Sequence, residues 1–206
     1  MTARPPTADA ISTHYERAAA GYTGRRGRGL AGAVRRREQA AVLDLAEPGR
    51  GSRILDVGCG DGEVAGLLLA RGARVVAVDL ALAMADAARR RGAWAVRADM
   101  RALPLRPAFD EVTCIGASEF VDDLTGLVAG LADCLRARGT LVLLFPRCNW
   151  FGVALWLYHR SNGVRIHIRS RGAVTRALVA AGFGAPDAWR RCAGAWVCRA
   201  RRGDGR

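Results

Sequence analysis

The sequence predicts an α/β protein with a doubly wound, mostly parallel seven-stranded sheet, helices on both faces and the last strand antiparallel. Two observations carry this prediction. Strand-like and helix-like segments alternate between residues 53 and 146, which is typical of a parallel sheet with right-handed crossover helices. Segments such as "TLVLLFP" (140–146) are apolar without alternation, as expected of strands that are covered on both faces.

The individual elements follow from apolar periodicity and from the glycines that interrupt it. The length of 206 residues and the hydrophobic content of 50% suit one packed domain. Helical spacing predicts helices over 8–20, 31–46, 63–72, 81–92, 124–139 and 171–183. Apolar runs predict strands over 53–58, 74–79, 93–99, 109–116 and 140–146, and residues 185–201 resemble a closing antiparallel hairpin.

The net charge of +13 would ordinarily suggest a nucleic acid or an anionic membrane as partner. All 32 basic residues are arginines in scattered clusters, which a GC-rich codon bias would also produce, so the sequence argues against a nucleic-acid partner. The six cysteines show no C-x-x-C spacing, and we expect no metal site. No apolar run reaches the roughly 20 residues that span a bilayer, and no signal-peptide pattern opens the chain. We therefore expect a cytoplasmic protein.

The segment "ILDVGCGDGEVA" (54–65) places three glycines at alternate positions after the first predicted strand. Ligands of such sheets bind at the carboxyl ends of the strands, near the topological switch point. The spacing G-x-G-x-G differs from the dinucleotide fingerprint G-x-G-x-x-G, and Asp56 before the glycines would repel a phosphate. A cationic ligand over the loop suits this pattern better, and a structural tight turn is the alternative.

Two further acids end the next predicted strands. Asp79 ends "VVAVD" and can accept both hydroxyls of a ribose, although an aspartate there can also cap the following helix. Asp99 ends the third strand in "RADM", where it could meet an adenine amino group while Met100 lies against the ring; a simple Asp turn is the alternative.

The order "ILDVGCGDG", "VVAVD", "RADM", "SEFVDD", "LRARGTLVLLFP" strongly resembles the class I S-adenosylmethionine-dependent methyltransferases, in their small-molecule branch, over roughly residues 11–185. The resemblance implies a Rossmann-like methyltransferase fold, S-adenosylmethionine as cofactor, and in-line methyl transfer to O, N or C of a small-molecule acceptor. It places Asp56 near the cofactor's ammonium, Asp79 on its ribose and Asp99 with Met100 at its adenine. Cofactor-binding residues implied in this way are Asp56, Gly58, Cys59, Gly60, Asp79, Leu80, Asp99, Met100 and Gly116. Asp61 and Arg138 depart from common family residues without affecting this implication.

The resemblance divides the single methyltransferase domain (1–206) into four parts: a helical cap (1–46), a cofactor-binding core (50–145), an acceptor-side insertion (146–170) and a closing helix and hairpin (171–201). A general base is needed only if the attacking atom carries a proton. Candidates are His167, Glu119 and Tyr15, with a structural role as the alternative for His167, and with His14 and His159 as weaker candidates.

The acceptor pocket is expected to involve the aromatic residues of the cap and the insertion, namely Tyr22, Trp150, Phe151, Trp156 and Tyr158. Two alternatives exist for the helix around 150–158. One face could simply pack on the core, or the helix, flanked by Arg147 and Arg160, could lie at a membrane interface and reach an acceptor there.

Other functions fit less well. A methyltransferase acting on RNA or protein is disfavoured because "GASE" (116–119) stands where base-methylating enzymes carry N/D-P-P-F/Y. A non-catalytic partner subunit of the same fold would be expected to have lost cofactor residues such as Gly58 and Asp79, which are present. A nicotinamide dehydrogenase is disfavoured by the glycine spacing. The sequence leaves the oligomeric state open.

Overall fold

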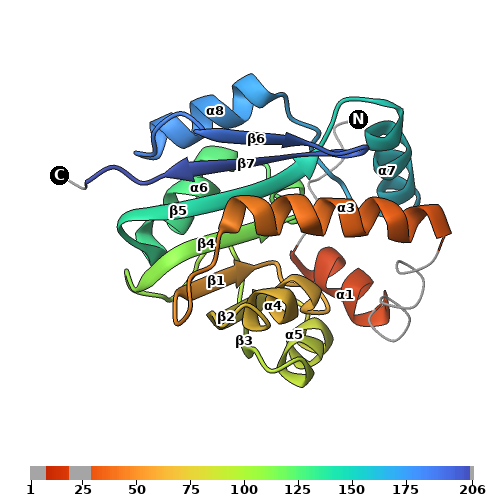
Figure 1. Cartoon of the computed structure of the whole chain (residues 1–206). Helices are drawn as coiled ribbons and strands as arrows, with labels where there is room; N and C mark the ends of the chain where they lie inside the picture. Colours follow the sequence, from red (N-terminus) through yellow and green to blue (C-terminus); the bar gives the residue numbers. More distant parts are fainter. Residues whose placement is uncertain (1–7, 19–28, 205–206) are drawn as a thin grey trace.

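A computed structural model of the chain describes residues 8–18 and 29–204 (Figure 1). Within these residues a seven-stranded sheet has the order β3-β2-β1-β4-β5-β7-β6. All neighbouring pairs are parallel except those made by β7. The strands are β1 (Arg53–Val57), β2 (Arg74–Asp79), β3 (Trp94–Arg97), β4 (Phe109–Ile115), β5 (Leu135–Pro146), β6 (Ala188–Arg191) and β7 (Ala195–Arg201). The predicted mostly parallel sheet with an antiparallel last strand is confirmed.

The helices cover both faces of this sheet. A buried cluster on one face joins α6 and α8 to the strands, and a second cluster on the other face joins α3, α4 and α5. The helices α1 and α7 instead lie beside the carboxyl ends of the central strands (Figure 1). Bounds are α1 (Ala8–Ala18), α3 (Gly29–Ala46), α4 (Glu63–Leu69), α5 (Leu82–Arg90), the 3₁₀ turn η2 (Ser118–Phe120), α6 (Leu124–Cys134), α7 (Trp150–Ser161) and α8 (Arg171–Ala180).

The switch point of the sheet lies between β1 and β4. The chain winds from β1 outward through β2 to β3, then returns to pair β4 with the other side of β1. Loops after β1 and β4 therefore diverge at their carboxyl ends and leave a crevice, which is where ligands bind in open α/β sheets. The glycine loop follows β1 directly at this crevice.

The largest error in a predicted boundary is at the end of α6. Helical spacing predicted a helix over 124–139, but α6 ends at Cys134 and β5 begins at Leu135. The register against β4 shifts between Phe109 and Glu111, and Arg138 has a left-handed φ of 61°. The segment before Gly139 is thus an irregular, bulged start of the strand, which apolar periodicity does not reveal.

The amino-terminal edge of the sheet carries a buried acid that opposes folding. Glu111 of β4 is only 5% exposed, and its Oε1 has no hydrogen-bond partner among the described residues. Burial raises its pKa from 4.5 to about 8, while the charge of Arg199 acts in the opposite direction. A raised folded-state pKa means that stability is complete below the unfolded pKa and falls as pH rises toward the folded pKa.

We therefore expect Glu111→Gln to raise the free energy of unfolding by about 3 kcal/mol at pH 8.5 and to have little effect near pH 4. Urea denaturation at the two pH values measures this difference. The exposed Asp133 on α6 provides the control, since Asp133→Asn should change stability little at either pH. An equal gain from Glu111→Gln at both pH values would contradict the titration argument.

Candidate active site

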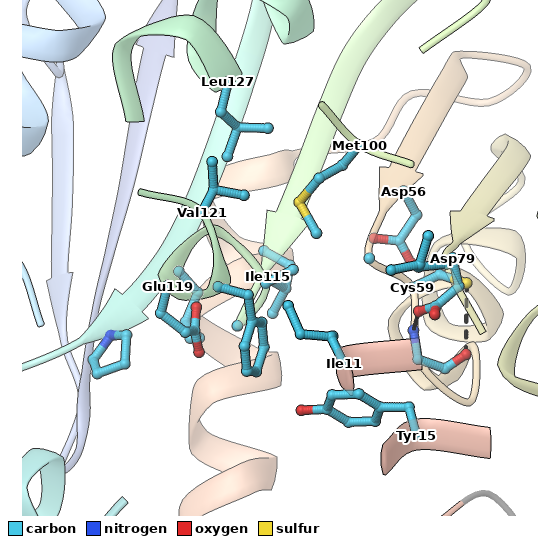
Figure 2. A pocket seen from close by; sticks show the side chains of 18 of the residues that line it. Ile11, Tyr15, Asp56, Cys59, Asp79, Met100, Ile115, Glu119, Val121 and Leu127 are labelled. Atoms are coloured by element: carbon cyan, nitrogen blue, oxygen red, sulfur yellow. Dashed lines mark hydrogen bonds between the residues drawn. The ribbon is translucent and has the colours of Figure 1, made fainter. Parts of the chain in front are cut away.

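A cavity of about 860 Å³ opens at the carboxyl ends of the central strands (Figure 2). This volume is within the range of small-molecule and cofactor sites. Its walls come from the glycine loop, the ends of β1, β2, β4 and β5, the turn η2, and the helices α1, α3 and α7. All nine predicted cofactor residues line it: Asp56, Gly58, Cys59, Gly60, Asp79, Leu80, Asp99, Met100 and Gly116.

The glycine loop is shaped by the packing of the protein chain itself. Gly58, Gly60 and Gly62 have φ angles of 68°, 53° and 74°, a region that favours glycine. A Cβ on Gly58 would lie 2.3 Å from Cβ of Ala117, and one on Gly62 would lie 2.5 Å from Cα of Ala88 in α5. From the sequence, a cationic ligand over the loop was favoured as the reason for these glycines, with a structural tight turn as the alternative. At Gly58 and Gly62, the close neighbouring backbone and side-chain atoms are enough to explain why no larger residue is present.

Asp56 at the end of β1 has an unusual environment. It is 1% exposed, its Oδ1 accepts a hydrogen bond from the Thr113 hydroxyl at 2.8 Å, and its Oδ2 has no partner among the described residues. Burial, and then the charge of Asp79, raise its pKa from 3.8 to about 7. A buried carboxylate without a counter-charge, on the wall of a cavity, suits a cationic group of a ligand.

Asp79 at the end of β2 accepts backbone hydrogen bonds from the glycine loop and from the segment before α5. One carboxylate oxygen accepts the Gly60 N–H and the other accepts the Ala81 N–H, both at 2.9 Å. Burial raises the pKa of Asp79, while these backbone hydrogen bonds act in the opposite direction. Each oxygen keeps a second acceptor direction. Asp79 is not the cap of α5, whose N-cap is Ala81 and has no side-chain cap hydrogen bond. Asp79 instead organises the local backbone and lines the cavity (Figure 2).

Asp99 and Met100 line the same wall after β3. The Arg101 backbone N–H and guanidinium both donate to the Asp99 carboxylate, with the closest approach 2.5 Å, and this hydrogen bonding lowers its pKa. Asp99 is therefore ionised at neutral pH and already held by Arg101. The Asp turn therefore occurs, and Asp99 also lines the cavity, while its contact with an adenine stays a prediction.

Asp61, which differs from the common family residue of this loop, is paired with two arginines. Its carboxylate contacts Arg35 of α3 at 3.3 Å and Arg91 at 3.5 Å, and Arg35 also pairs with Glu63. Asp61 is 4% exposed, so these contacts offset the cost of burying its charge. They also fix α3 over the glycine loop.

The helix α1 is held across the opening by its own side chains. The Glu16 carboxylate accepts the N–H groups of Leu82 at 2.5 Å and Ala83 at 3.1 Å, and so occupies the amino terminus of α5. Ile11 and Tyr15 of α1 then line the cavity between the Asp79 side and the Glu119 side (Figure 2). This arrangement is consistent with the predicted helical cap; Tyr22 lies outside the described residues.

The side of the cavity away from the glycine loop combines rings with polar groups. The Phe120 ring meets Tyr15 edge to face at 5.8 Å and His159 at 5.4 Å. Glu119 and His159, 4% and 3% exposed, both line the cavity. His159 comes from the buried face of α7. Sequence reasoning ranked it below His167, although its position eight residues after Phe151, close to two helical turns, is a signal for the same helix face.

His167 supports the wall from behind. It is not among the cavity-lining residues. Its backbone N–H donates to the Glu119 carbonyl at 2.8 Å. Its Nε2 contacts the carboxylate of Asp122, and Asp122 does line the cavity. Arg169 adds hydrogen bonds to the carbonyls of Ser118 at 3.1 Å and Asp122 at 3.0 Å. The structure therefore gives His167 a supporting position under η2, which agrees with the structural role named as the alternative to contact with the acceptor.

The aromatic residues of the insertion divide between two faces of α7. Phe151 lines the cavity together with Leu155, which the sequence did not single out. Trp150 and Tyr158 are 69% and 55% exposed, and Trp156 is half-buried under the guanidinium of Arg160. Those three do not line the cavity, so the expectation for Trp150, Trp156 and Tyr158 is corrected.

No group of three or more His, Cys, Asp or Glu side chains within residues 8–18 and 29–204 could hold a metal ion. In the same residues, no helix has both the length and the apolarity needed to cross a bilayer.

A glycine loop at the switch point, with acids at three successive strand ends around one cavity, defines a Rossmann-like protein that binds a nucleoside cofactor with a cationic group. Comparison with known proteins agrees. Residues 55–143 match the model of a methyltransferase domain. A ubiquinone biosynthesis O-methyltransferase from Xanthomonas oryzae pv. oryzae is 37% identical over 112 residues, which are 50% of this chain and 45% of that protein.

Solved structures show the same fold. Magnesium protoporphyrin IX methyltransferase from Synechocystis with bound SAH has a TM-score of 0.78 at 16% identity, covering 96% of this chain and 100% of its own. The [4+2]-cyclase SpnF has a TM-score of 0.79 at 18% identity, covering 97% of each chain. The methyltransferase-domain match over residues 55–143 and the fold shared with these structures support a class I S-adenosylmethionine-dependent methyltransferase. The chain spans 45% of the length of the curated relative above. The name of SpnF shows that proteins with this fold also carry out another reaction.

Proposed function

We propose that the chain transfers the methyl group of S-adenosylmethionine to a small, largely apolar acceptor. The observation that carries this proposal is the Asp56 carboxylate, which is buried on the cavity wall with Oδ2 lacking a partner among the described residues. A buried acid of this kind is costly unless a cation meets it. The amino-acid end of the cofactor carries an ammonium group that suits this position.

The remaining cofactor contacts follow from the same wall. Asp79 has acceptor directions left for ribose hydroxyls, and Asp99 with Met100 would border the adenine. When bound, S-adenosylmethionine supplies a methyl group on a positively charged sulfur, so the protein's task is mainly alignment and exclusion of water. Ile11 and Tyr15 of α1 would close the site above it.

The acceptor would lie among Tyr15, Phe120, Phe151 and Leu155, which provide apolar and aromatic walls. Glu119 and His159 are two buried polar groups on this side that can accept a proton from an acceptor hydroxyl. The curated relatives are named as O-methyltransferases, which supports a hydroxyl acceptor. We therefore assign the proton-accepting role to Glu119 or His159, and a positioning role to His167 through its contact with Asp122.

The proposal is tested by isothermal titration of the purified chain with S-adenosylhomocysteine, with NADH as a parallel ligand. We expect micromolar affinity for the first and no measurable binding of the second. Incubation with methyl-labelled S-adenosylmethionine and a series of phenols and quinols should then transfer label to the organic phase. NADH binding alone would overturn the cofactor assignment, and cofactor binding without transfer to any phenol or quinol would overturn the acceptor class.

Asp79→Ala is expected to weaken S-adenosylhomocysteine binding at least tenfold, because a charged acceptor for two hydroxyls is lost. The same titration measures the change. Asp86→Ala is a matched control, since Asp86 is a partly exposed acid on α5 that contacts Arg89 and does not line the cavity. Unchanged binding by a folded Asp79→Ala protein would contradict the ribose contact.

A further inference from the structure

The helix α7 has an exposed apolar face on its outer side, which no other part of the described chain covers. Trp150, Val153, Leu157 and Tyr158 are 69%, 49%, 55% and 55% exposed. At 100° per residue these positions fall on one side of the helix. Gly152 and His159 on the opposite side are buried. Exposed apolar groups this concentrated mark an interaction surface more often than chance.

The segment of the chain that carries this face has charges of one sign. Residues 134–186, which include α7 and its flanks, contain no aspartate or glutamate. Arg160 stands at the end of α7 with its guanidinium over the Trp156 ring, and Arg165 is exposed shortly after it. A neutral protein partner would not require this absence of acids, whereas an anionic lipid surface attracts arginines and repels carboxylates.

The residue types also match a lipid interface. Trp and Tyr are enriched where hydrocarbon meets water, and arginine side chains extend from such a position to the lipid headgroups. The 12 residues of α7 span about 18 Å, too little to cross a bilayer but enough to lie in its surface plane. The helix stands at one end of the molecule, beyond the carboxyl edge of the sheet (Figure 1).

We propose that the outer face of α7, formed by Trp150, Val153, Leu157 and Tyr158 with Arg160, docks on an anionic lipid membrane. The opposite face of the same helix contributes Phe151, Leu155 and His159 to the cavity wall. Docking would therefore place the cavity beside the bilayer surface. Resting on the proposed function, this makes a membrane-dissolved, lipophilic molecule the acceptor.

The test uses the full chain and vesicle flotation, without cofactor. Vesicles of phosphatidylcholine are compared with vesicles containing 30 mol% phosphatidylglycerol. We expect at least tenfold stronger binding to the anionic vesicles, reduced severalfold when salt is raised from 0.05 to 0.5 M. Leu157→Glu, which places a charge in the apolar face, should lower vesicle binding at least tenfold. Arg160→Gln with Arg165→Gln should weaken binding to anionic vesicles and leave neutral vesicles unaffected.

Trp94→Ser is the matched control, because Trp94 is an 81% exposed aromatic residue on the sheet-edge strand β3. It should bind vesicles like the parent chain. Equal binding by Leu157→Glu, or loss with Trp94→Ser, would overturn the assignment of this surface. So would a dimer in light scattering that Leu157→Glu dissociates while no vesicle binding occurs. Because S-adenosylhomocysteine titration is independent of vesicles, failure of docking is distinguished from failure of the proposed methyl transfer.

Discussion

Replacing Gly62 by alanine is expected to lower the free energy of unfolding by about 3–5 kcal/mol, a large share of the stability of an ordinary domain. Two costs add. The φ of 74° disfavours any residue with a Cβ. The new methyl would also lie 2.5 Å from Cα and 2.7 Å from Cβ of Ala88, and the backbone of α5 cannot move away as a flexible side chain could.

Gly66→Ala is a sensitive control for this prediction. It lies four residues further along, inside α4, where a Cβ would meet only Arg91 Cδ at 3.7 Å, an ordinary contact. Alanine there should raise stability by about 0.5–1 kcal/mol, because glycine is a poor helix former. Thermal denaturation should therefore move in opposite directions for the two variants. A Gly62→Ala protein as stable as the parent would show that the loop tolerates a side chain.

The strand ends explain how much of the site could be predicted from the sequence. A strand, its terminal acid and the following turn are contiguous in the chain, so Asp56, Asp79, Asp99 and the glycine loop were located by local patterns alone. The parallel sheet then brought these separate ends to one edge, as the topology requires.

The acceptor side was harder because it depends on which face of α7 turns inward. Apolar residues occur all around this helix, so periodicity gives no single buried face, and Trp150 was expected inside while it lies outside. His159 and His167 illustrate the same limit. Their positions depend on long-range packing against η2, and only His159 has a local signal, its place eight residues after Phe151 on α7. The cytoplasmic location and the four-part division of the domain stay predictions.

Cofactor binding is expected to depend on pH through Asp56. The pKa of Asp56 in the free protein is raised to about 7, chiefly by burial, so at pH 6 most molecules carry a neutral carboxyl. The ammonium group of S-adenosylhomocysteine favours the ionised form. Affinity should therefore increase about tenfold between pH 6 and pH 8 and level off above that. Calorimetric titration across this range, in buffers of matched ionic strength, measures the slope.

Asp56→Asn isolates the contribution of this carboxyl. The amide keeps an oxygen for the Thr113 hydroxyl but cannot ionise, so binding at pH 8 should fall at least tenfold and lose most of its pH dependence.

The free energy of unfolding of Asp56→Asn should change in the opposite sense. A raised folded pKa costs stability as pH rises above 3.8 toward 7, so the variant should be more stable than the parent by up to about 3 kcal/mol at pH 8 and equally stable near pH 4. A variant that gains stability while losing cofactor affinity would identify Asp56 as a charge held in place for its ligand. A variant that loses both would show that the carboxylate stabilises the fold, and the cationic-ligand argument would then fail.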